Sequence, residues 1–302
     1  MIPAAWSAPL ALYLWQVALH ASVMGVIFYV WAPRVRLPSG GAKRRLLAIL
    51  LVLPMITAAM PGRSGVEFGE RIALLNSARL LAVRLPFGFQ LYHLALLVGV
   101  VAAGLTFWQE VLPSFRQPRA GESDVPPWLA TLVRARTGWD RCAVAISPLP
   151  SIMLVTGGVP GRPRLTVSRG AIALLTADEL DVAVAHEHAH WESGRWFLSH
   201  ALFVVRVLQC YSPVALWVFR EYCIEVEIGC DAAAVAGRDP RLLVRVLLRI
   251  YQATDRRDAA ARAAIRKRVD VLLDGGPRDG ELSPVAIAAA SLVMLLVLPW
   301  LV

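Results

Sequence analysis

Long uncharged stretches dominate the first third of the chain and recur at its end. Four of them contain no Asp, Glu, Lys or Arg over enough residues to cross a hydrocarbon core of about 30 Å, and they are Pro9–Trp31, Leu46–Gly62, Leu91–Trp108 and Leu282–Val302. The first stretch has no basic residue before it and no small-residue cleavage site, so we interpret it as an anchor and not a cleaved signal peptide. The pattern predicts an α-helical multi-span membrane protein, with three transmembrane helices and their loops in residues 1–112 and a fourth in residues 282–302.

Residues 113–281 have a mixed pattern that predicts an α+β domain inserted between the third and fourth spans. Short runs rich in β-branched and apolar residues, "CAVAIS", "IMLVTGG" and "RLTVS", are separated by Pro- and Gly-containing turns and predict a small antiparallel sheet. The stretch "DRRDAAARAAIRKR" reads as an exposed helix. Between the sheet and that helix, Thr176 and Glu179 have the spacing of a capping box, which predicts that a helix begins there.

Composition supports the membrane class and sets an orientation. The chain is 57% hydrophobic and 18% charged, with a net charge of +9, which is too apolar for an ordinary soluble protein. The first loop, "APRVRLPSGGAKRR", carries five basic residues and no acid, so we place it in the cytoplasm. The N- and C-termini are then outside a bacterial-type inner membrane, and residues 113–281 are cytoplasmic.

The positive charge raises the question of a partner. Nucleic acid is one candidate for a basic chain, but we favour the anionic surface of the lipid bilayer and expect no nucleic-acid partner. Arg241, Arg245 and Arg249 recur every four residues, as a lipid-facing helical stripe would. A solvated helix face explains the same spacing equally well.

The predicted helix carries "HEHAH", in which His186 and His190 are four residues apart and share a face. With Glu187 between them, this is the HExxH arrangement of two imidazole metal ligands and a carboxylate general base. His188 points to the opposite face, and we interpret it as a packing residue. Five residues with three fixed positions also occur by accident, so the motif needs a third ligand.

The third ligand is expected in "FREYCIEVEIGCDAAAVAGRDP", a mostly apolar helix in which Glu227 and Asp231 share a face. Glu227 can complete the zinc site, and Asp231 can accept a hydrogen bond from the second ring nitrogen of a ligand histidine. Glu221 and Glu225 are rivals, but neither has an Asp four residues further on. The plain alternative is that Glu227 and Asp231 form a solvated helix face.

The apolar segment between the two motifs, "WFLSHALFVVRVLQCYSPVALWVF", must turn back if one zinc ion is to bind both. As a single helix its roughly 24 residues would separate its ends by about 36 Å, whereas zinc ligands lie about 2.2 Å from the ion. Proline disfavours helix continuation, so we predict a break at Cys210–Pro213. Residues 195–236 are then a helical hairpin associated with the membrane.

These motifs resemble the membrane zinc metallopeptidases of the BlaR/MecR antirepressor type. The likeness rests on "LTADELDVAVAHEHAH", on "YSPVALWVFREYCIEVEIGCD" and on "IRKRVDVLL". It implies a zincin-like domain of the minigluzincin kind, with His186, His190 and Glu227 as Zn²⁺ ligands, Glu187 as the general base and Asp231 behind the ligands. Since no residue follows Val302, we expect the penicillin-binding sensor domain of the best-known members to be lacking.

The resemblance implies a zinc-dependent endopeptidase that cleaves cytoplasmic or membrane-proximal proteins in regulated proteolysis or signalling. "RPRLTVS" is our candidate for the edge strand that binds an extended peptide, and His200, Arg220, Tyr222 and Arg238 are candidates for an oxyanion donor. A regulatory protein or a second copy of the chain is a further candidate partner. The alternatives are a prenyl-protein or quality-control gluzincin, a zinc-holding receptor or scaffold, and a transporter-like bundle with an incidental motif.

Overall fold

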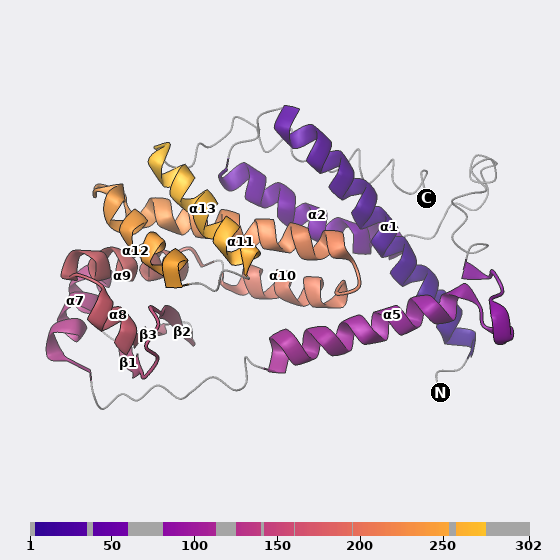
Figure 1. Ribbon diagram of the computed structural model, residues 1–302, viewed down its shortest axis with the longest axis horizontal. Helices are drawn as coiled ribbons and strands as arrows, with labels where there is room; N and C mark the ends of the chain where they lie inside the picture. The colour runs from indigo at the N-terminus through magenta and orange to yellow at the C-terminus, as the bar shows by residue number, and fades with distance from the viewer. Residues whose placement is uncertain are drawn as a thin grey trace. The chain divides into compact units, whose positions relative to one another are not determined.

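The computed structural model describes residues 4–34, 39–59, 81–112, 125–139, 142–159, 161–194, 196–253 and 258–275. It is mostly helical with one three-stranded sheet (Figure 1). The chain divides into two compact units: the first contains the described parts of Met1–Arg116 and of His200–Cys223, and the second those of Gln117–Ser199 and of Ile224–Arg278.

The first unit is built from long apolar helices. They are α1 (Ala4–Arg34), α2 (Gly41–Ala59) and α5 (Leu91–Thr106). The short 3-10 turn η2 (Pro86–Gly88) precedes α5, and the π-helical turn η3 (Phe107–Val111) continues it. Helix α1 packs against both α2 and α5. Apolar residues of α1 and α2, such as Met24 and Leu47, are fully buried.

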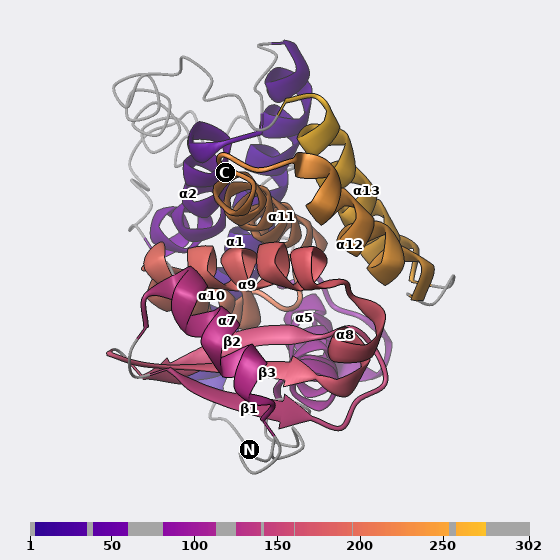
Figure 2. The same ribbon diagram turned by 90° about the vertical axis from the view of Figure 1, so that its left-hand side faces the viewer.

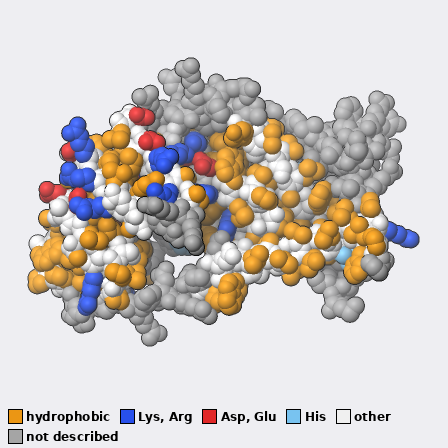
Figure 3. Space-filling view, in the orientation of Figure 1, with side chains coloured by type: hydrophobic (Ala, Val, Ile, Leu, Met, Phe, Trp, Pro, Cys, Tyr) orange, Lys and Arg blue, Asp and Glu red, His pale blue; other side chains and the backbone are white. Residues whose placement is uncertain are grey.

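Two stretches of the described residues are long and apolar enough to cross a membrane, Pro9–Tyr29 and Leu91–Gln109. They coincide with the first and third predicted spans. Hydrophobic side chains cover α5 (Figure 3), and none of its apolar window is buried. The predicted span Leu46–Gly62 overlaps α2 but is not one of these two helices, and Leu282–Val302 lies outside the described residues.

The apolar segment after the histidines is broken into two helices, α10 (Trp196–Leu208) and α11 (Pro213–Ala234). A turn closed by the Ser212 N–H bond to the Gln209 carbonyl (2.8 Å) separates them, and the two helices lie side by side in Figure 1. The ring centroids of Phe203 and Phe219 are 6.0 Å apart across the pair. The break therefore falls at the predicted Cys210–Pro213.

The sheet of the second unit is mixed, so the predicted antiparallel sheet is wrong in part. Its strands are β1 (Ala143–Ser147), β2 (Leu154–Val159) and β3 (Arg162–Ser168), in the order β1-β3-β2. Strand β3 pairs antiparallel with β2 and parallel with β1. The strand "RPRLTVS" is therefore central and has no free edge. Apolar alternation predicts that a strand forms but not which neighbours it pairs with, and this explains the error.

Helices α7 (Pro127–Thr137), α8 (Arg169–Leu174), α9 (Ala177–Glu192), α12 (Pro240–Ala253) and α13 (Ala259–Leu273) complete the second unit. Helix α9 packs against α7, α12 and β2, and α12 packs against α13 (Figure 2). The core contains Leu165 and Val167 from β3, Val182 and Val184 from α9, and residues of α12 and α13. This core fixes the position of α9.

The capping box at the start of α9 is confirmed. The Thr176 hydroxyl accepts a hydrogen bond from the Glu179 N–H (3.3 Å), and the Glu179 carboxylate accepts one from the Thr176 N–H (3.0 Å). Glu179 is buried and lies 3.3 Å from Arg245 and 3.5 Å from Arg249. Two arginines of the predicted stripe therefore pair with an acid of the protein itself.

Candidate metal centre

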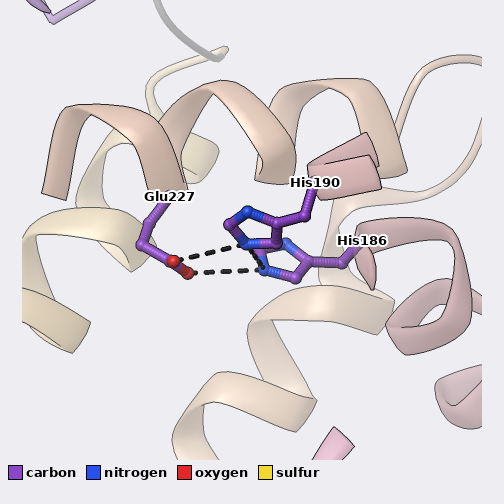
Figure 4. Close-up of side chains that lie close together, drawn as sticks. All are labelled: His186, His190 and Glu227. Carbon is purple, nitrogen blue, oxygen red and sulfur yellow. Dashed lines mark hydrogen bonds and ion pairs between the residues drawn. The ribbon is translucent and has the colours of Figure 1, made fainter. Parts of the chain in front are cut away.

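Three side chains from two helices converge in the second unit. His186 and His190 lie one turn apart on α9, and Glu227 faces them from α11 (Figure 4). The His186 and His190 Nε2 atoms are 3.1 Å apart. The Glu227 carboxylate oxygens lie 3.4 Å from His186 Nε2 and 3.3 Å from His190 Nε2. Residues more than 35 positions apart thus meet at one point.

These separations match those around one tetrahedral ion. With bonds of about 2.0–2.1 Å, neighbouring ligand atoms of tetrahedral zinc lie about 3.3–3.4 Å apart. The three measured distances, 3.1, 3.3 and 3.4 Å, lie close to that value. Two imidazoles and one carboxylate are a donor set that zinc accepts, and a fourth position would remain open for water. The residues fit a catalytic type of metal site.

Asp231 and Arg268 lie behind the three converging side chains. Asp231 Oδ1 is 2.9 Å from His186 Nδ1, although the ring N–H is not aligned well enough for a regular hydrogen bond. Arg268 of α13 donates two hydrogen bonds of 2.7 Å to Asp231 and lies 3.0 Å from Glu227 Oε2. Asp231 therefore lies next to His186, as expected.

The charged groups of the cluster shift one another's pKa values. Burial favours neutral rings, but Asp231 and Glu227 outweigh it and raise the pKa of His186, while Cys230 and Glu227 do the same to the pKa of His190. Burial likewise opposes ionisation of Glu227, yet its contacts with the two histidines hold its pKa well below the ordinary value. A cation is thus favoured between these groups, whether it is a proton or a metal ion.

Glu187 contacts the sheet. Its carboxylate accepts a hydrogen bond of 2.8 Å from the Thr156 N–H of β2. Because β3 lies on the other side of β2, this bond uses a backbone group on the free side of the strand. The candidate base directly follows His186 and borders the sheet edge.

The other residues singled out in the sequence make contacts away from the three converging side chains or belong to the first unit. His188 packs against Trp139, with ring centroids 4.9 Å apart, as expected for a residue facing away from the site. Glu225, a rival ligand, is fully buried and lies 3.1 Å from Lys267.

Arg238, a candidate oxyanion donor, contacts Asp181 and the Ala234 carbonyl. The other three oxyanion candidates, His200, Arg220 and Tyr222, belong to the first unit.

Sequence reasoning missed the contribution of α13. Its stretch was expected to be an exposed helix, but Arg268 is only 15% exposed and touches two acids of α11. A signal was present, because two carboxylates on an apolar helix need compensating positive charge. Nothing in the sequence specifies which of the many arginines supplies it.

The chain matches no protein-family model and no curated protein.

Proposed function

We propose that the chain is a membrane-embedded, zinc-dependent endopeptidase that hydrolyses peptide bonds of cytoplasmic or membrane-proximal proteins. The convergence of His186, His190 and Glu227 at tetrahedral spacing carries the proposal. The HExxH motif adds Glu187, a carboxylate that a purely structural metal site would not need. The domain would then be a zincin of the gluzincin type, held to the bilayer by α1, α5 and the hairpin of α10 and α11.

Zinc bound by these ligands would polarise the scissile carbonyl and lower the pKa of the attacking water. Glu187 would take the proton from that water and deliver it to the leaving amine. Asp231 would hold the His186 ring so that Nε2 faces the ion. The chain thereby supplies the ligands, the base and the orientation that peptide hydrolysis requires.

The substrate would bind along β2 and not along β3. Strand β2 is an edge strand, and its Thr156 contacts Glu187 directly. An extended peptide that added to this edge by main-chain hydrogen bonds would lie beside the general base. Val155 and Val159 are 49% and 59% exposed and would border the peptide.

The experiment compares purified wild-type chain with the Glu187→Gln variant in detergent. Both should bind about one zinc per chain by atomic absorption, while cleavage of an unfolded test protein such as casein, or of the chain itself, should fall about 10²–10⁴-fold in the variant. His188→Gln is the matched control, since His188 packs against Trp139, and it should keep both properties.

Each outcome is decisive. Unchanged proteolysis in Glu187→Gln would refute the assigned base. Zinc bound by a wild-type chain that cleaves neither casein nor itself would favour the zinc-holding receptor or scaffold instead. A wild-type chain without zinc would end the proposal.

A further inference from the structure

Three acidic side chains of α11 face two neighbouring basic side chains of α13. Glu225 and Asp231 are 0% and 1% exposed, and Glu227 belongs to the ligand cluster. Lys267 lies 3.1 Å from Glu225, whereas Arg268 contacts Asp231 and Glu227. The contacts given above for Arg268 reach the ligand cluster, whereas that of Lys267 is with Glu225.

The Arg268 guanidinium bridges the two carboxylates that touch the histidines. Its Nε and Nη2 atoms each lie 2.7 Å from an oxygen of Asp231, and Nη1 lies 3.0 Å from Glu227 Oε2. Asp231 Oδ1 in turn lies 2.9 Å from His186 Nδ1. One planar group therefore contacts Glu227 directly and borders the His186 ring through Asp231.

Arginine suits this position for a geometric reason. Its five N–H donors form a rigid fork that can bind both oxygens of one carboxylate and still reach a second acid. Lysine carries the same charge on a single ammonium group and cannot match the pattern. The Arg268 side chain is only 15% exposed, so water offers little replacement for the hydrogen bonds that a substitution would remove.

We infer that Arg268 is a positioning residue of the metal centre, which is assembled from three helices, α9, α11 and α13, and not from two. The inference rests on the proposed metal site. Its consequence is that metal affinity depends on α13, a helix that contributes no ligand. Outer partners of metal ligands typically change affinity about 10–100-fold when they are removed.

The test measures zinc affinity of the full chain in detergent by competition with a chromophoric chelator. Arg268→Ala should bind zinc about 10–100-fold more weakly than wild type. Arg268→Lys should also bind zinc at least several-fold more weakly than wild type, because a lysine ammonium group does not orient both acids. Arg266→Ala is the matched control: it removes one positive charge from an exposed position of the same helix, where Arg266 contacts the Tyr251 hydroxyl, and should keep wild-type zinc affinity.

A second readout separates positioning from folding. Cobalt(II) bound in place of zinc reports ligand geometry through its visible absorption, so Arg268→Lys should alter that spectrum while circular dichroism remains unchanged. If Arg268→Ala fails to fold, the lysine variant decides the question alone. Wild-type affinity and spectrum in Arg268→Lys, with zinc bound normally by wild type, would overturn this inference only. Failure of the wild-type chain to bind zinc would overturn the proposed function as well.

Discussion

At the scale of single residues, the centre is defined by charge compensation in a buried place. Glu227 and Asp231 would be costly as isolated carboxylates, and each is surrounded by cationic or hydrogen-bonding groups. Histidines supply part of this compensation and Arg268 the rest. Protons on the imidazoles and a metal ion would therefore compete for the same position.

This competition predicts a pH dependence of zinc binding. The raised pKa values of His186 and His190 mean that the metal-free site holds at least one proton at neutral pH. Zinc requires neutral rings, so binding should release at least one proton at pH 7. The apparent affinity should fall about tenfold per pH unit for each proton displaced as the pH decreases.

Calorimetric titrations at pH 7 in two buffers of different ionisation enthalpy would count the protons, and chelator competition at pH 6, 7 and 8 would give the slope. Glu187→Gln should release the same number of protons, because Glu187 is not a ligand. An affinity that does not change from pH 6 to 8 would contradict the prediction.

At the scale of elements, α9 is placed by its capped start and its buried face. The Thr176 cap satisfies a backbone N–H of the first turn, and Leu180, Val182 and Val184 anchor the helix in the core. His186 follows one helical turn after Val182. The hairpin of α10 and α11 returns the chain so that Glu227 can meet the histidines.

The cap gives a prediction about stability alone. Thr176→Ala should lower the free energy of unfolding by about 1 kcal/mol, which corresponds to a decrease of roughly 2–4 °C in the melting midpoint. Zinc affinity at 25 °C should not change, since Thr176 does not touch the ligands. Thr176→Ser keeps the hydroxyl and should melt like wild type, as followed by circular dichroism. A zinc affinity lowered together with the midpoint would show that the cap also sets the ligand geometry.

At the scale of the whole molecule, the expected membrane topology can be checked by labelling. If α10 and α11 form a membrane-associated hairpin, residues before and after it lie on the same side of the bilayer. In the predicted orientation, with the basic first loop in the cytoplasm, that side would be the cytoplasmic one. Val83, which follows the second predicted span, would lie outside.

Single cysteines at Val83, Glu192 and Asp239, in a chain without its four native cysteines, test this arrangement. All three wild-type side chains are exposed. A membrane-impermeant maleimide should label Val83→Cys in intact cells, and Glu192→Cys and Asp239→Cys only after permeabilisation. Labelling of Glu192 and Asp239 from opposite sides would mean that the segment crosses the membrane.

The sequence by itself determined the elements whose cause is local. The capping box fixed the start of α9, the spacing of four placed two histidines on one face, and proline broke the apolar segment into α10 and α11. Each of these follows from backbone geometry within a few residues. The helices α1 and α5 were equally readable, because length and lack of charge suffice.

The tertiary structure alone decided which distant parts meet. It placed β3 between β1 and β2, so the free edge beside Glu187 belongs to β2. It brought Arg268 to Asp231 and Glu227, although many other arginines could have compensated the same acids. Strand order and ion-pair choice depend on how the core packs, and a local pattern contains no information about a neighbour that is remote in the chain.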